Sequence, residues 1–278
     1  MNKRLEKLYG SANISDALLN PTYGVMMRRK PVYIVTQASQ AELKDLAALA
    51  FRDIRGDEWF SQHIPMATYR MFIKGFADGT FRGSSLISRA ECLTMLARFN
   101  HTEEMIKQKA EADIQKRAQF AGLVGNEWYT DYVIVASEAM PYPEQITREF
   151  ILKPMTRGEV FHALAATLWR DDIEANGRYY ETALINKNPA FSDTQKVTFL
   201  INPQGEEGSF WWFNQLEDAV KNPERGVPMD FYPAIFCLKD KGILLGNNGS
   251  SKWNSSITRA EVLALFERLA AVWGKETE

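Results

Sequence analysis

Three arginines in the sequence share a local context that suits the binding of an anion. Each follows a Ser or Thr and is followed by a small residue and then a Glu; they are Arg89, Arg157 and Arg259. An arginine at a helix start adds a forked, permanently charged donor to the free backbone amides there. The pattern therefore predicts an anion site. The alternative is that each arginine only ties its helix start to a neighbouring carboxylate or carbonyl.

The residues around each arginine predict where a helix begins. Ser88, Thr156 and Thr258 are good N-caps, because their side-chain oxygens can accept from the first free amides of a helix. A Glu three residues after each cap completes a capping box, and the apolar residue before each cap fits a hydrophobic staple. We expect the glutamates to act as caps. These residues are Glu91, Glu159 and Glu261, preceded by Ile87, Met155 and Ile257.

An aromatic pair lies upstream of each capping box at nearly the same distance, so the chain contains three internal repeats. In the first repeat an apolar helix and the turn Ala77-Asp78-Gly79-Thr80 separate the pair from the box, and the third has Asn247-Asn248-Gly249 at that place. The second repeat has no glycine there. Each repeat therefore predicts a helix, a loop and a capped helix. The pairs are Trp59-Phe60, Trp128-Tyr129 and Phe231-Tyr232.

The repeats divide the chain into an N-terminal extension and three units. Phe191-Ser192-Asp193 echoes Phe51-Arg52-Asp53 but lies far ahead of Phe231, so an insertion splits the third repeat. In the extension, residues 31–36 indicate a short strand or extended arm, and residues 40–52 indicate a helix that enters the first repeat. The predicted boundaries are 1–50 for the extension, 51–100, 113–170 and 191–272 for the repeats, and about 194–228 for the insertion.

These motifs resemble the S-layer homology (SLH) domain. The first repeat matches the family pattern best, whereas the second is recognised by Met-Thr-Arg-Gly-Glu and its Trp spacing and the third by Ile-Thr-Arg-Ala-Glu. The resemblance implies a mainly α fold, in which three helix-loop-helix units surround a pseudo-threefold central helical bundle. The matching residues of the first repeat are Phe51-Arg52-Asp53-Ile54, Trp59, Gly75-Phe76-Ala77-Asp78-Gly79-Thr80-Phe81-Arg82 and Ser88-Arg89-Ala90-Glu91.

The resemblance also implies a ligand and the residues that contact it. SLH grooves bind anionic, typically pyruvylated, secondary cell wall polysaccharides of Gram-positive bacteria and hold a protein on the cell surface. Asn248 stands where the family has Asp, and Phe231 stands where it has Trp. The second repeat also lacks the glycine turn. We therefore expect one or two fully competent grooves between neighbouring units, with Arg89→Ala weakening binding more than Arg157→Ala. The implied ligand-binding residues are Trp59, Asp78, Gly79, Arg82, Arg89, Trp128, Arg157, Gly249, Lys252 and Arg259.

Some of these residues have a purely structural alternative. Trp59 and Trp128 are of a type that fills cores, so either could be a core wedge rather than a platform for a ligand. Asp78 could simply shape its turn, since Asp-Gly is a common turn pair. Cys92 and Cys237 lie in apolar helical patterns, and we expect two separate buried thiols rather than a disulfide.

Composition excludes several classes of protein. The 33 Lys and Arg against 35 Asp and Glu leave a formal charge of −2, which excludes a strongly basic nucleic-acid binder. No window approaches the ~20 apolar residues of a membrane span. His63, His101 and His162 are scattered, and the sequence has no zinc motif, nucleophile elbow or phosphate loop. We therefore expect no catalysis, no cofactor and no metal.

The N-terminus motivates a second hypothesis. The first twenty residues have a basic start but no apolar core of a secretory signal, whereas the resemblance implies a cell-surface location. The protein could instead be a structural or receptor-binding component of a larger assembly, such as a phage virion assembled in the cytoplasm; a trimmed start is a third possibility. The N-terminal arm would then contact protein partners. Phe210-Trp211-Trp212-Phe213 would do the same, or form an aromatic plug or bind a sugar.

Overall fold

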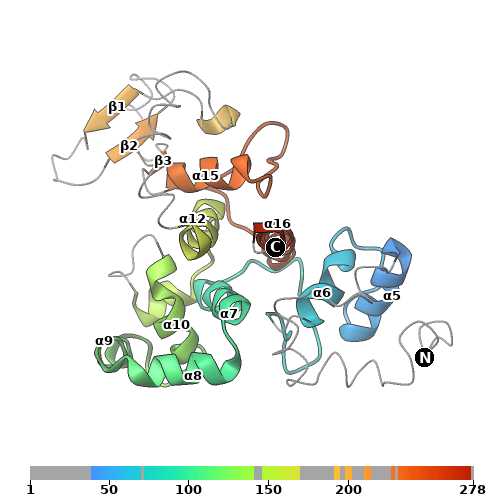
Figure 1. The fold of residues 1–278 in the computed structure, drawn as a ribbon, viewed down its shortest axis with the longest axis horizontal. Helices are drawn as coiled ribbons and strands as arrows, with labels where there is room; N and C mark the ends of the chain where they lie inside the picture. The colour runs from blue at the N-terminus through green and yellow to red at the C-terminus, as the bar shows by residue number, and fades with distance from the viewer. Residues whose placement is uncertain are drawn as a thin grey trace. The chain divides into compact units, whose positions relative to one another are not determined.

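The structure is a computed structural model of a mainly helical chain (Figure 1). It describes residues 39–69, 72–140, 146–169, 191–194, 198–201, 210–213, 227–228 and 231–276. The predicted strand at 31–36 lies outside these residues. The chain divides into two compact units, which we call the terminal unit (Met1–Val135 with Thr258–Glu278) and the middle unit (Ala136–Ile257).

The terminal unit contains the first repeat and the last helix of the third. The predicted helix that enters the first repeat is confirmed as α5, and α5 packs on η1 and α6. The elements are α5 (Gln40–Ala50), η1 (Ser61–His63), α6 (Ile64–Tyr69), α7 (Arg89–Asn100), α8 (Glu103–Ala112), α9 (Ile114–Val124), α10 (Thr130–Ala136), which runs one residue past the unit boundary, and α16 (Arg259–Glu276).

The three predicted capping boxes are confirmed. At the start of α7 the amide of Glu91 donates to Ser88 Oγ at 3.3 Å, and the amide of Ser88 donates to Glu91 Oε2 at 2.9 Å. Thr156 with Glu159 and Thr258 with Glu261 make the same reciprocal pair of bonds. Because these contacts span only three residues, they set the helix starts locally.

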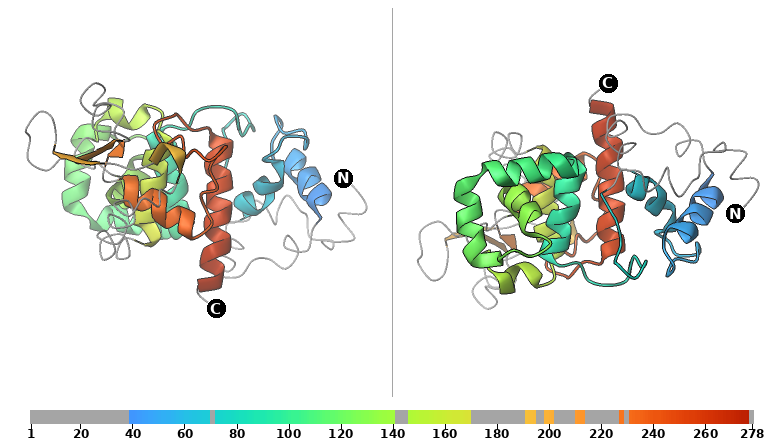
Figure 2. Two further views of the ribbon diagram at one scale, coloured as in Figure 1. Left: turned by 90° about the horizontal axis from the view of Figure 1, so that it is seen from above. Right: turned by 90° about the horizontal axis from the view of Figure 1, so that it is seen from below.

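An aromatic cluster joins helices of the terminal unit that are far apart in sequence. The ring of Phe266 on α16 lies 5.5 Å from that of Phe72 and 5.4 Å from that of Phe99 on α7, between centroids. Helix α16 also packs against α6, as both views of Figure 2 show. Burial of this apolar surface holds the C-terminal helix to the first repeat.

The middle unit is built around the packing of α12 against α15. Gly158 at the start of α12 is required by this packing, because a Cβ there would lie 2.7 Å from the ring of Phe231 and 3.1 Å from the carbonyl oxygen of Trp253. The elements are η2 (Ser137–Ala139), α11 (Arg148–Leu152), α12 (Arg157–Leu168), η4 (Ser192–Thr194), β1 (Thr198–Ile201), β2 (Phe210–Phe213), β3 (Val227–Pro228) and α15 (Phe231–Asp240).

A small antiparallel sheet forms within the predicted insertion. Its order is β1-β2-β3, with Phe199 opposite Trp212 and Trp211 opposite Pro228. The aromatic run of the insertion is therefore the central strand, which the sequence analysis did not predict. The orientations of its side chains lie outside what the structure describes, so the plug and the exposed contact both stay predictions.

The two cysteines are Cys92 on α7 and Cys237 on α15. Both are buried and neither forms a disulfide, as expected from the apolar helical patterns around them. The three-unit pseudo-threefold bundle stays a prediction.

Candidate ligand-binding site

Asp53 holds the loop of the first repeat in place. Its Oδ1 accepts from the amide of Phe81 and its Oδ2 from the amide of Arg82, both at 2.7 Å. Arg82 has a left-handed backbone, with φ 58°, so the carboxylate stabilises a conformation that is otherwise disfavoured. Gly75 is also needed here, because it has φ 68° and a Cβ would lie 2.4 Å from the Phe51 ring. The Phe-x-Asp motif therefore fixes the loop geometry, a function that sequence reasoning missed.

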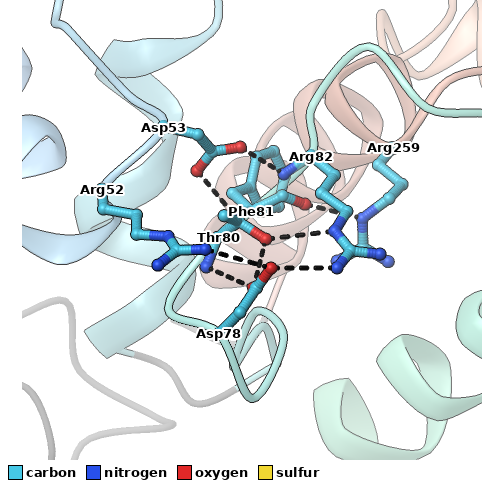
Figure 3. Close-up of polar contacts among 7 residues, drawn as sticks. All are labelled: Arg52, Asp53, Asp78, Thr80, Phe81, Arg82 and Arg259. Carbon is cyan, nitrogen blue, oxygen red and sulfur yellow. Dashed lines mark hydrogen bonds and ion pairs between the residues drawn. The ribbon is translucent and has the colours of Figure 1, made fainter.

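Asp78 shapes the turn and pairs with cations at its surface (Figure 3). Its Oδ1 accepts from the amide of Thr80 at 3.1 Å and from the hydroxyl of Thr80 at 2.6 Å. Its Oδ2 lies 3.1 Å from Nη2 of Arg82 and 3.4 Å from Nη2 of Arg52. The hydrogen bonds from Thr80 and Arg82 lower the pKa of Asp78 to about 2. The alternative prediction, that Asp78 shapes its turn, is confirmed.

Arg259 is bound by the loop of the first repeat rather than open to solvent. Its Nε donates to the carbonyl of Phe81 at 2.9 Å, and its Nη1 lies 2.8 Å from Glu91 Oε1. The guanidinium also lies over the Phe76 ring, 4.7 Å from the centroid. Burial lowers the pKa of Arg259, and the charge of Glu91 opposes that shift. Arg259 thus makes the contacts expected of a structural arginine, because it ties the start of α16 to a carboxylate and a carbonyl.

The first amides of α16, which have no acceptor within the helix itself, donate to the loop of the first repeat. Arg259 donates its amide hydrogen to Ser85 O at 2.9 Å, and Ala260 donates to Gly83 O at 3.0 Å. These carbonyls satisfy groups that would otherwise attract an anion. The start of α16 is therefore a docking point for the loop.

The middle unit repeats this construction with different parts of the chain. Asp193 accepts from the amides of Ser251 and Lys252 at 2.8 and 2.7 Å, and Lys252 has φ 52°. Arg157 at the start of α12 donates from Nε to the carbonyl of Ser251 at 3.0 Å, and Gly158 donates its amide hydrogen to the carbonyl of Trp253 at 2.6 Å. The loop of the third repeat thus docks on the helix start of the second.

The loops therefore pair with arginines of other repeats. Asp78, Gly79 and Arg82 were expected to act together with Arg89, but a helix-start arginine of another repeat, Arg259, donates to their loop at the carbonyl of Phe81. Arg89 is only 8% exposed at the start of α7. Gly249 and Asn248 lie in the loop of the third repeat with positive φ, in the places of Gly79 and Asp78.

A pocket of about 390 Å³ opens in the terminal unit beside the first loop. Trp128 lines it with 60% of its surface exposed. Trp59 is 56% exposed and packs edge-on against Phe60, away from the pocket lining. The core interpretation is therefore wrong for both tryptophans. The lining residues are Phe72, Ile73, Lys74, Gly75, Phe76, Ala77, Glu91, Thr94, Met95, Arg98, Trp128 and Arg259.

A polar cluster centred on Glu103 borders this pocket. Glu103 Oε1 accepts from Lys74 Nζ at 2.6 Å and from Arg98 Nε at 2.9 Å, and Oε2 accepts from the Tyr132 hydroxyl at 2.7 Å. Partial burial raises the pKa of Glu103. The hydrogen bonds from Lys74 and Tyr132 and the charge of Arg98 lower it by a larger amount, so the pKa lies below its ordinary value. Sequence reasoning missed Lys74 and Arg98, although Lys74 directly precedes the glycine of the loop motif.

Comparison with known proteins identifies one segment of the chain. Residues 50–92 match the family model of the S-layer homology domain, a family of cell-wall-binding modules. The match covers the first repeat from Phe51 to the start of α7. No curated protein and no solved structure matches the chain.

The described residues offer neither a membrane span nor a metal site. No helix there is long and apolar enough to cross a membrane. In the same part of the chain, no group of three or more His, Cys, Asp or Glu could hold a metal ion.

Proposed function

We propose that this protein is a non-catalytic binding protein of the cell surface, which holds an anionic, pyruvylated cell wall polysaccharide in the pocket of the terminal unit. The observation that carries the proposal is the SLH match at residues 50–92, because this segment supplies the loop and the helix start that line the pocket. SLH domains are wall-binding modules, and the proposal extends that activity to a particular place in this chain.

The pocket has the composition of a saccharide site. Its volume falls within the range of about 300–1,000 Å³ that small-ligand sites occupy. Phe72, Phe76 and Met95 give it an apolar floor, and the exposed ring of Trp128 offers a flat face for a sugar ring. An apolar lining with a few polar groups suits a sugar, because a sugar ring has an apolar face and carries polar hydroxyl groups at its edge.

The charges of the lining favour a carboxylate on that ligand. Lys74, Arg98 and Arg259 are cationic, whereas Glu91 is the acidic residue of the lining. Glu103 beside the pocket offsets one more positive charge. A positive surplus remains, and it favours the carboxylate of a pyruvyl group over a neutral sugar.

We extend the proposal to the other repeats as copies of the same module. Asp193 accepts from the amides of Ser251 and Lys252 in the loop of the third repeat, as Asp53 accepts from two amides of the first loop, which supports a shared origin. Asn248 replaces the acidic Asp78, so this loop lacks the surface ion pair of the first. We therefore place the main binding capacity in the terminal unit.

Co-sedimentation with cell walls tests the proposal. The protein should pellet with walls that retain the pyruvylated polymer and stay in solution with walls stripped of it. Trp128→Ala should weaken binding by about tenfold, since stacking of an aromatic ring contributes about 1–1.5 kcal/mol. Trp59→Ala is the matched control, because Trp59 is equally exposed but lies outside the pocket.

Two results would refute the proposal. Equal pelleting with both kinds of wall would show that the polymer is not the ligand. A larger loss for Trp59→Ala than for Trp128→Ala would show that the pocket is not the site. The hypothesis of a virion component finds no support in the comparisons and stays a prediction from the sequence.

A further inference from the structure

The cations that line the pocket differ in their access to a ligand. Within the described residues these are Arg259, Arg98 and Lys74, whose side chains are 8%, 14% and 42% exposed. Arg259 already donates hydrogen bonds to Glu91 and to the carbonyl of Phe81 in the loop. Lys74 is therefore the cation that a ligand in the pocket can reach most readily.

Arg98 is held in place by more contacts than Lys74. Its Nε donates to Glu103 at 2.9 Å and its Nη2 donates to the Tyr132 hydroxyl at 2.9 Å. Its guanidinium also lies 4.7 Å from the centroid of the Tyr132 ring. A planar guanidinium fixed at several points cannot turn towards a ligand without losing all of these contacts. Arg98 therefore serves as a fixed part of the pocket wall.

Glu103 keeps its other partners when Lys74 moves away. Arg98 donates to the same Oε1 as Lys74, and the Tyr132 hydroxyl donates to Oε2. A half-buried carboxylate that lost its last partner would be costly, but this one retains two donors. Because Lys74 ends in a compact ammonium on a flexible stem, it can change acceptor at little cost.

We propose that Lys74 is the residue that binds the ligand's carboxylate, and that it exchanges Glu103 for this carboxylate when the pocket fills. Glu103 is then an internal competitor that weakens the binding of anions. The identity of the ligand rests on the proposed function, whereas the exchange itself rests on the contacts of Lys74. No catalytic step is involved, because one ion pair replaces another.

The test measures affinity by calorimetry for a soluble fragment of the pyruvylated polymer and for the same fragment after removal of the pyruvate. Lys74→Gln should bind the pyruvylated fragment roughly three- to tenfold more weakly than wild type, which is the effect of one partly exposed charge-assisted contact. The two proteins should bind the depyruvylated fragment equally, because the lost contact is to the carboxylate.

Two further variants complete the design. Lys107→Gln makes the same charge change on α8, where Lys107 is 71% exposed and pairs with Glu111 at 3.9 Å, and it should bind within twofold of wild type. Glu103→Gln should bind the pyruvylated fragment at least twofold more tightly than wild type, because the internal competitor is gone. Circular dichroism should verify that each variant is folded.

The possible outcomes separate this inference from the proposed function. If wild type fails to bind the pyruvylated fragment, the proposed function fails. If wild type binds but Lys74→Gln binds within twofold of it, Lys74 is not the carboxylate contact and the inference is overturned. A folded Glu103→Gln protein with equal or weaker affinity would overturn the exchange, because the ion pair would then act as a structural clamp.

Discussion

Replacing Asp53 with Ala should destabilise the loop of the first repeat by about 2–3 kcal/mol. The substitution removes both acceptors that hold the amides of Phe81 and Arg82 at 2.7 Å. Phe81 is fully buried, so its amide would lose its partner at a cost of about 1–3 kcal/mol. Arg82 is exposed, so water can replace the acceptor of its amide and the added cost is about 0.5–1 kcal/mol.

The loss should be visible at two levels. Hydrogen exchange should show faster exchange at the amides of Phe81 and Arg82, because the acceptors that protect them are gone. Urea unfolding should show a lower midpoint for the transition of the terminal unit; the chain has two compact units, so two transitions are to be fitted. Asp53→Asn keeps one acceptor and should cost roughly 1–2 kcal/mol.

Asp193 provides the matched control for this prediction. It holds the amides of Ser251 and Lys252 in the middle unit at nearly the same distances. Asp193→Ala should therefore increase exchange at those two amides and leave Phe81 unchanged. Asp53→Ala with unchanged protection at Phe81 and a loss of stability below about 0.5 kcal/mol would refute the reasoning.

Two further predictions concern the same loop. Gly75→Ala should lower the free energy of unfolding by more than about 3 kcal/mol in urea unfolding, because its Cβ would meet an aromatic ring at 2.4 Å. Gly242→Ala, just after the end of α15, with φ 70° and no atom within 4 Å, should cost only about 1 kcal/mol; equal losses would contradict the close approach at Gly75. Asp78 should titrate near pH 2 by NMR, because Thr80 and Arg82 stabilise its ionised form, and Arg82→Ala should raise that pKa. Since the pKa of Asp78 in the folded protein lies below its ordinary value, the stability that ionised Asp78 contributes is complete above about pH 4 and is lost as the pH falls towards 2. An unshifted titration would show that the hydrogen bonds from Thr80 and Arg82 do not form.

The helix starts were predictable because their determinants are local. Ser88 and Glu91 are three residues apart, and the bonds between them form whenever the chain turns into a helix. The same holds for the boxes that begin at Thr156 and Thr258. The mainly helical fold and the SLH character of the first repeat followed from these short patterns and their recurrence.

The sequence did not reveal that the Asp of the Phe-x-Asp motif holds a distant loop. Asp53 lies 28 residues from its partner Phe81, and Asp193 lies 58 residues from its partner Ser251. Sequence shows that the motif recurs, but it gives no distance between parts of the chain so far apart. The exposure of Trp59 and Trp128 was undecided for the same reason, since residue type does not specify which face a neighbouring segment covers.

By itself, the sequence determined where the capped helices begin, that the chain repeats, and that its first repeat resembles a wall-binding module. Only the tertiary structure decided that the loop of the first repeat docks on Arg259, and that Lys74 rather than a helix-start arginine is the accessible cation of the pocket. The physical reason is that capping depends on residues three apart, whereas burial and ion pairing depend on which distant segments pack together. Arg259, which the sequence alone predicts as part of an anion site, is instead paired with Glu91 and hydrogen-bonded to a loop carbonyl.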